Sequence, residues 1–276
     1  MMQEFSRRDH TITFVDTSPS ELIHTLADKI LVFSHINFDN IEFDEINLRQ
    51  FKDTRTTERK LKAQDYVIDR FETKKITGYG IIRWNTQRLA LSNATNLLIS
   101  SGLLKGNNLK PSDRIDIAGE KVSIGHLLSL SWYALLLSIC SREVSIWTTV
   151  EKKIKAIILM DLLPGDSIDS SRNFNIVRYI IKNSILDGMF SDAIKAKKLK
   201  HIAFGYGSKE GSTKDLKNSP PSSISDWITQ SFYCKLRCEK IIKDESYDTN
   251  IKFSKLADYL IEKKFFLIDK PFRLTE

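Results

Sequence analysis

Three aspartates lie at positions from which a metal-dependent reaction could use them. Asp16 closes the stretch HTITFVD, Asp161 closes the apolar run AIILMD, and Asp226 lies near the start of an amphipathic stretch. Mg²⁺ and Mn²⁺ prefer oxygen ligands, and two such ions about 3.5–4 Å apart can activate water and neutralise a leaving phosphoryl oxygen. The sequence gives the order of these carboxylates and not their convergence. For each of them, a role that only caps a turn stays open.

The elements that would position the aspartates are short strands and one helix. Residues 156–160 form an apolar run bounded by charge and by Pro164-Gly165, which is typical of a strand buried on both faces. Open α/β sheets place ligands at the carboxyl ends of such strands. Residues 10–16 alternate well enough for another strand that ends on Asp16. The sequence therefore predicts that Asp16 and Asp161 lie on adjacent strands.

The remaining pattern favours an α/β fold with a mixed sheet and helices on both faces. Other strands are expected at 29–33, 76–84 and 201–206. Helices are expected at about 21–28, 89–104, 124–139, 174–185, 223–237 and 253–263, with one or two more between 39 and 73. We interpret residues 1–240 as one α/β domain with a helical insertion near 89–150. Residues 241–276 then form a C-terminal helical extension packed on it.

Composition bounds the class of protein. The 276 residues are 41% apolar and 28% charged, which is ordinary for a globular chain, and the net charge of +7 favours polyanionic partners. No window approaches about 18 uncharged apolar residues, so no membrane span is expected. Three cysteines without framework spacing indicate a reducing cytoplasm.

The order of the elements resembles the ribonuclease-H-like proteins, and among them the bacterial family that carries domain of unknown function 3800. The resemblance rests on FVD at 14–16, LMD at 159–161, Ser208-Lys209 and SDWI at 225–228, and it spans roughly residues 11–237. It implies a ribonuclease-H-like fold and a site in which Asp16, Asp161 and Asp226 bind Mg²⁺ or Mn²⁺. It also implies bacterial accessory or defence loci.

The chain departs from that family at three positions. Thr17 replaces an acidic residue, and Ser223 and Ser225 replace a Gln and an Ala before the last Asp. Asp166, Glu42 or Glu45 could supply a missing ligand. A decayed site that binds without cutting is the consequence if none of them does.

Two other groups of residues have both a chemical and a structural interpretation. Cys234 and Cys238 share a helix face, but a zinc site needs about four ligands, so buried structural thiols are favoured. The basic run at 195–200, together with Lys209 and Lys214, is either a solvated surface or a patch that contacts a nucleic-acid backbone.

The sequence thus predicts a divalent-metal-dependent nuclease, a hydrolase that cuts phosphodiester bonds of DNA or RNA. The alternative is a non-catalytic nucleic-acid- or partner-binding protein on the same fold. No membrane partner is expected, and a homo-oligomer or a protein partner stays open.

Overall fold

The computed structural model of the chain describes residues 10–19, 22–25, 30–42, 48–105, 110–150, 152, 155–160, 170–189, 199–204, 220–239 and 251–268. Its strands are β1 (His10–Ser18), β2 (Ile30–Ile41), β3 (Ile76–Thr86), β4 (Arg114–Ile117), β5 (Glu120–Ser123), β6 (Lys155–Met160), β7 (Leu199–Phe204) and β8 (Phe266–Ile268). Its helices are the short 3-10 helix η3 (Phe51–Asp53) and the α-helices α1 (Thr57–Glu72), α2 (Gln87–Ser100), α3 (Ile124–Val150), α4 (Ser170–Lys182), α7 (Pro220–Cys238) and α9 (Lys255–Glu262).

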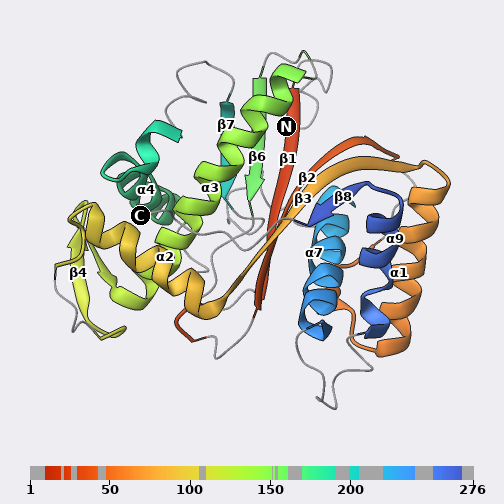
Figure 1. Cartoon of the computed structure of the whole chain (residues 1–276), viewed down its shortest axis with the longest axis horizontal. Coiled ribbons are helices and arrows are strands. Elements are labelled where there is room, and N and C mark those ends of the chain that lie inside the picture. The colour runs from red at the N-terminus through yellow and green to blue at the C-terminus, as the bar shows by residue number, and fades with distance from the viewer. Residues whose placement is uncertain are drawn as a thin grey trace.

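Six strands form one mixed sheet in the order β7-β6-β1-β2-β3-β8 (Figure 1). Strand β1 pairs antiparallel with β2 and parallel with β6, and β6 pairs parallel with β7. Strand β3 pairs antiparallel with β2 and parallel with β8. The mixed α/β class and five of the strands expected from the sequence are confirmed, although β2 is longer than the expected 29–33.

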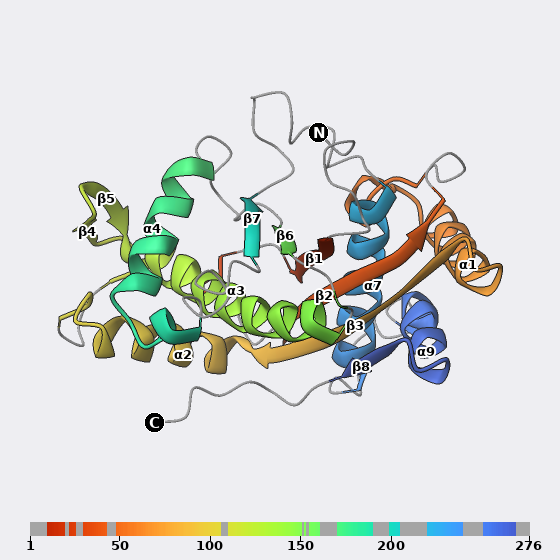
Figure 2. The same ribbon diagram turned by 90° about the horizontal axis from the view of Figure 1, so that it is seen from above.

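Helices cover both faces of the sheet, so the protein has two hydrophobic cores. Helices α2, α3 and α4 pack on one face, and α1, α7 and α9 pack on the other (Figures 1 and 2). Side chains alternate between these two cores along β1, β2 and β6, as the pleat requires. On β1, Val15 belongs to the α3 side and Phe14 to the α7 side.

The most apolar helix, α3, is central to the first core. Its serines at 131, 138 and 141 are buried and donate hydrogen bonds of 2.7–2.8 Å to the carbonyls four residues earlier, which lets hydroxyls lie in an apolar core. The segment Ile124–Trp147 has a mean hydropathy of 1.5 and would suit a membrane span by length and composition. The expectation that no window approaches such a length was therefore wrong. However, 89% of that window is buried inside the protein, as in a core helix.

Three local features differ from the sequence expectations. The insertion near 89–150 contains the β4–β5 hairpin as well as helices. Residues 22–25, expected to be helical, form a turn. The apolar tail of the C-terminal extension provides β8, an edge strand that follows α9. Short strands with few residues give too little periodicity to be recognised in a sequence.

Candidate active site

Strands β1 and β6 run side by side in parallel, although β1 continues past Asp16 to Ser18 and does not end on Asp16 as expected. Val15 pairs with Met160 in the parallel ladder, and these are the residues directly before Asp16 and Asp161. Asp161 itself lies outside the described residues. The expectation that the two strands are neighbours is confirmed, and it follows from their runs of buried apolar residues on both sides of the sheet.

Asp16 is buried, with 6% of its surface exposed, and lies on the face of the sheet that α7 covers. Its neighbours two residues away on the same face show this, because Phe14 packs in the α7 core and Ser18 donates a 2.7 Å hydrogen bond to Gln230 of α7. The Asp16 carboxylate accepts a 2.9 Å hydrogen bond from the backbone N–H of Thr17. A buried carboxylate is costly unless it is hydrogen-bonded, paired or bound to a cation.

Thr17, one of the departures from the resembled family, and Glu42, one of the substitutes considered, lie away from the Asp16 carboxylate. The hydroxyl of Thr17 is 3.1 Å from that of Tyr133 in α3, on the opposite face of the sheet from Asp16. Glu42 follows the carboxyl end of β2, which is antiparallel to β1, so it lies at the other end of the sheet. Of the substitutes considered from sequence, Glu42 is therefore badly placed to join Asp16, while Glu45 and Asp166 lie outside the described residues.

Asp226 lies in the second turn of α7 and ties that helix to the segment before α1. Its Oδ2 accepts a 2.6 Å hydrogen bond from the backbone N–H of Phe51, and the indole N–H of Trp227 donates a 2.7 Å bond to the carbonyl of Arg49. Lys60 also interacts electrostatically with Asp226; burial lowers the pKa of Lys60, and the nearby carboxylate opposes that shift. The observed contacts of Asp226 thus give it an anchoring role, whatever else it does.

The same face of α7 meets the sheet next to Asp16. Thr229 and Gln230 follow Asp226 by about one helical turn of 5.4 Å. The hydroxyl of Thr229 bonds that of Ser34, and Ser34 is the residue of β2 paired with Asp16. Helix α7 therefore packs against the sheet beside Asp16, while the carboxylate of Asp226, about one turn earlier, bonds the N–H of Phe51.

Buried hydroxyls extend this polar region toward the start of α7. Ser222 and Ser225 are buried, with 3% and 1% of their surfaces exposed, and their Oγ atoms have no hydrogen-bond partner among the described residues. Ser223, the other departure from the family pattern, is 1% exposed. Unsatisfied buried hydroxyls are uncommon and call for a partner such as water or an ion.

Within the described ranges, no three side chains of His, Cys, Asp or Glu converge on a point where they could hold a metal ion. Asp161, Ser208 and Lys209 are not among those residues. The donor set that can be located consists of two carboxylates, at 16 and 226, with hydroxyls around them. Oxygen donors of this kind suit Mg²⁺ or Mn²⁺.

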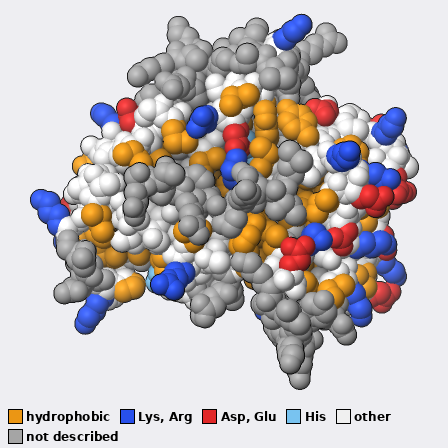
Figure 3. Space-filling view, in the orientation of Figure 1, with side chains coloured by type: hydrophobic (Ala, Val, Ile, Leu, Met, Phe, Trp, Pro, Cys, Tyr) orange, Lys and Arg blue, Asp and Glu red, His pale blue; other side chains and the backbone are white. Residues whose placement is uncertain are grey.

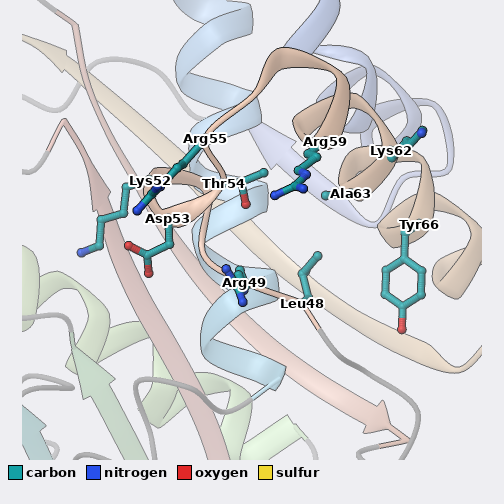
Figure 4. A pocket seen from close by; sticks show the side chains of 10 residues that line it. All are labelled: Leu48, Arg49, Lys52, Asp53, Thr54, Arg55, Arg59, Lys62, Ala63 and Tyr66. Carbon is teal, nitrogen blue, oxygen red and sulfur yellow. The ribbon is translucent and has the colours of Figure 1, made fainter.

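A basic groove of about 920 Å³ lies beside this region, along η3 and the first turns of α1 (Figure 4). We define the basic groove by its lining residues Leu48, Arg49, Lys52, Asp53, Thr54, Arg55, Arg59, Lys62, Ala63 and Tyr66. Five of them are cations and one is an anion. The groove was not predicted from the sequence, although Lys52, Arg55, Arg59 and Lys62 recur at three- and four-residue spacing. Only Arg59 and Lys62 lie on one face of α1, whereas Lys52 belongs to η3 and Arg55 precedes the helix, so spacing explains the groove only in part.

Several charges on α1, α7 and α9 differ from those of the groove because they are paired. Over α1 and α9, acidic and basic side chains alternate (Figure 3). Lys235 bonds Asp258 at 2.7 Å and Lys255 bonds Asp65 at 2.7 Å. Most of the basic run predicted as a backbone-contacting patch, at 195–198, lies outside the described residues, as do Lys209 and Lys214. The last residues of that run, 199 and 200, begin β7.

A second group that was not predicted from the sequence is buried on the α3 face. Nδ1 of His35 lies 2.9 Å from Oε2 of Glu143, and Arg83 bonds the other oxygen of that carboxylate. The imidazole stacks on Trp147 with ring centroids 4.4 Å apart. These residues come from β2, β3 and the end of α3, so no local motif could have revealed them. They fix the long helix to the sheet.

The cysteines behave as structural thiols. Cys140 and Cys234 are buried and form no disulfide, and Cys238 is half-buried. Burial raises the pKa of Cys234 to about 12, and burial also raises the pKa of Cys238. Thiols that stay protonated are poor metal ligands. The interpretation that this pair is structural accords with these environments.

Comparison of the chain with protein-family models, with curated proteins and with solved structures finds no match. The function is therefore inferred from the site.

Proposed function

We propose that this protein is a divalent-metal-dependent nuclease with a ribonuclease-H-like fold, in which Asp16, Asp161 and Asp226 hold Mg²⁺ or Mn²⁺. The observation that carries the proposal is the pairing of Val15 with Met160. It makes the strands that lead to Asp16 and Asp161 parallel neighbours, and the last described pair of their ladder directly precedes these two residues in the sequence. The carboxyl end of a parallel pair is where α/β sheets gather ligands.

Two further observations support the proposal. The sheet order agrees with the resemblance to ribonuclease-H-like proteins, in which the strand ending in the first Asp lies beside the central strand ending in the second. The helix that carries Asp226 packs on the same face as Asp16, and its contact with Ser34 brings it next to that residue. The resemblance implies this convergence of a late helix on two strands.

The residues have distinct roles in such a mechanism. Bound ions would activate the attacking water and neutralise the leaving oxygen of the scissile phosphate. Asp16 is buried and held by the N–H of Thr17, so it is a rigid ligand. Asp226 is oriented by the N–H of Phe51, so its carboxylate is held in one direction. Cations of the basic groove would position the substrate.

A specific observation favours a second candidate, a nucleic-acid-binding protein that does not cut. The bond from Phe51 to Asp226 is complete without a metal, and Thr17 stands where the resembled family has an acid. On this alternative the carboxylates are caps and anchors, and the groove alone is functional.

One assay separates the two candidates. Purified protein is incubated with single- and double-stranded DNA and RNA in Mg²⁺, in Mn²⁺ and in EDTA, and its thermal unfolding is followed under the same conditions. The nuclease cuts at least one substrate in metal and none in EDTA, and the metal raises its melting temperature. A protein that binds the substrates, cuts none of them and gains no stability from either ion is the non-catalytic alternative.

A further inference from the structure

The basic groove is lined by cations that are available to a ligand. Arg49, Lys52, Arg55 and Arg59 are exposed, and none of the four side chains forms an ion pair with any residue the structure describes. Lys62 is paired with Glu58 at 2.6 Å, but both side chains are about three-quarters exposed, at 74% and 76%. Exposed pairs of this kind are weak and exchange readily. The groove therefore offers four or five positive charges to an anion.

The start of α1 adds to this field. Thr56 caps the helix, and its side chain accepts a hydrogen bond from the backbone N–H of Arg59. The remaining N–H groups of the first turn and the helix dipole place partial positive charge at this end of α1. Arg55 and Arg59 flank the cap on both sides. The helix dipole and the side chains of Arg55 and Arg59 therefore both attract an anion to the basic groove.

The other side of α1 carries the opposite charge. A second groove, of about 480 Å³, lies between α1 and α9 and is lined by Asp65, Ile68, Asp69, Glu72, Lys255, Asp258, Tyr259 and Glu262. Five of these are carboxylates and one is a cation. A polyanion is attracted to the first turns of α1 and repelled from its later turns, so the charge pattern confines it to the basic groove.

The groove wall is also the segment that holds Asp226. The carbonyl of Arg49 and the N–H of Phe51 bond Trp227 and Asp226, while the side chains of Arg49 and Lys52 line the groove (Figure 4). A ligand in the basic groove therefore lies against the backbone that orients one carboxylate of the candidate site.

Shape and residue type indicate the class of ligand. A concave groove fits a chain of phosphates better than the flat surface of a bilayer. Three of the five cations are arginines, whose planar guanidinium groups bind phosphate oxygens through two parallel hydrogen bonds.

We infer that the basic groove binds the phosphodiester backbone of a nucleic acid and leads it past Asp226. This inference rests on the proposed function for its direction, because it makes the groove the substrate track of the same site. It moves the nucleic-acid contact from the predicted basic run at 195–200 to η3 and α1.

The test measures binding in EDTA, so that it does not depend on cleavage. A variant with Lys52→Ala, Arg55→Ala and Arg59→Ala is compared with wild type on labelled single-stranded DNA and RNA of about 20 nucleotides. Its affinity should fall at least about tenfold, without sequence preference. The slope of log affinity against log salt should become shallower by about 0.7 for each phosphate that the variant no longer neutralises. A second variant, with Lys52→Glu and Arg55→Glu, should bind more weakly still, because it repels phosphate.

The control removes the same kinds of charge from the opposite side of the sheet. Arg88, Lys121 and Arg142 are exposed on α2, β5 and α3, and their replacement by Ala should leave affinity within about twofold and reduce the salt slope little. Thermal unfolding of every variant checks that the fold is intact.

The outcomes distinguish this inference from the proposed function. If the groove variants bind as wild type does, the inference is overturned, even if the wild type cuts. If they lose binding while the wild type cuts nothing in Mg²⁺ or Mn²⁺, the groove stands and the nuclease is rejected. Loss of binding to phosphatidylserine vesicles, with nucleic-acid binding unchanged or absent, assigns the groove to membranes and overturns the inference.

Discussion

Nδ1 of His35 lies 2.9 Å from Oε2 of Glu143, and this contact joins the second strand of the sheet to the far end of α3. Burial lowers the pKa of His35 below its ordinary 6.5; hydrogen bonding to Glu143 opposes the shift, and Arg83 adds to it. Burial raises the pKa of Glu143, but His35 and Arg83 together outweigh it, so that pKa lies below 4.5. The group is thus a neutral imidazole beside an ion pair.

The pH dependence of stability follows from these directions. A lowered histidine pKa contributes stability that is full above pH 6.5 and lost as the pH falls below it. The lowered pKa of Glu143 contributes stability that is full above 4.5 and lost below it. We expect the free energy of unfolding in urea to decline from about pH 7 to about pH 4, by up to about 1.4 kcal/mol per pH unit for one group.

His35→Asn tests this assignment. It should lower stability at every pH, because the stack on Trp147 is lost, but it should flatten the decline between about pH 7 and pH 5. The flattening is the informative readout. A variant whose curve runs parallel to that of wild type would show that another group causes the acid loss.

Glu143 carries the negative charge that pairs with the largely buried Arg83. Arg83 has 13% of its side chain exposed, so Glu143→Gln leaves a largely buried guanidinium without its anion. We expect a loss of about 3 kcal/mol in urea unfolding at neutral pH, as for a broken buried pair. Glu58→Gln, which breaks the exposed pair with Lys62, is the control and should leave stability close to that of wild type.

Two substitutions at Asp226 separate its anchoring role from a metal-binding role. Asp226→Asn keeps an oxygen that can accept from Phe51, so stability should change by less than about 1 kcal/mol, whereas metal-dependent cleavage should be lost. Asp226→Ala removes the acceptor and should cost about 1.5–3 kcal/mol as well. Cleavage that survives in the Asn variant would make Asp226 an anchor of η3 alone.

Asp16→Asn and Asp161→Asn test the other two ligands. Mg²⁺ should raise the melting temperature of wild type. At an ion concentration of a hundred times the dissociation constant, binding adds about 2.7 kcal/mol to the free energy of unfolding. The variants should show no such increase. Without metal, stability should hold or rise, because fewer carboxylates repel each other. If either residue is only a cap, its variant loses about 1 kcal/mol in EDTA and shows the same response to Mg²⁺ as wild type. Asp187→Asn, at an exposed position after α4, is the control.

Gly80 tests how β8 joins the sheet. A Cβ at this position would lie 2.5 Å from the ring of Phe266 and 2.7 Å from the carbonyl oxygen of His35. Gly80→Ala should therefore cost about 1–3 kcal/mol, as overpacking does. Gly188→Ala, where nothing lies within 4 Å of the added Cβ, should be close to neutral. If the two substitutions change stability equally, β8 shifts to accommodate the added Cβ with no loss of stability.

Much of the sheet could be predicted from the sequence, because β1, β3, β6 and β7 are marked by alternation or by unbroken apolar runs. The pairing of β1 with β6, and so the place of Asp16 beside the carboxyl end of β6, could be predicted for the same reason. The partners of these elements could not. The bond from Asp226 to Phe51 and the bond from His35 to Glu143 join residues far apart in sequence, and no periodicity encodes such a contact. The basic groove could be predicted only in part, since Arg59 and Lys62 share a face of α1 but Lys52 and Arg55 precede that helix.

The position of β1 in the sheet has a consequence for how the chain is made. One edge of β1 forms backbone hydrogen bonds with β2, which follows closely in the sequence. Its other edge pairs with β6, which is synthesised only after residues 19–154. During synthesis on the ribosome, the β6 edge of β1 therefore stays unpaired while β2, β3, α2 and α3 emerge. A contact of such long range slows folding, and an unpaired strand edge invites association with other chains. We expect truncated chains that end before residue 155 to bind chaperones or aggregate, and release of β6 from the exit tunnel to be the moment at which the nascent protein becomes resistant to protease.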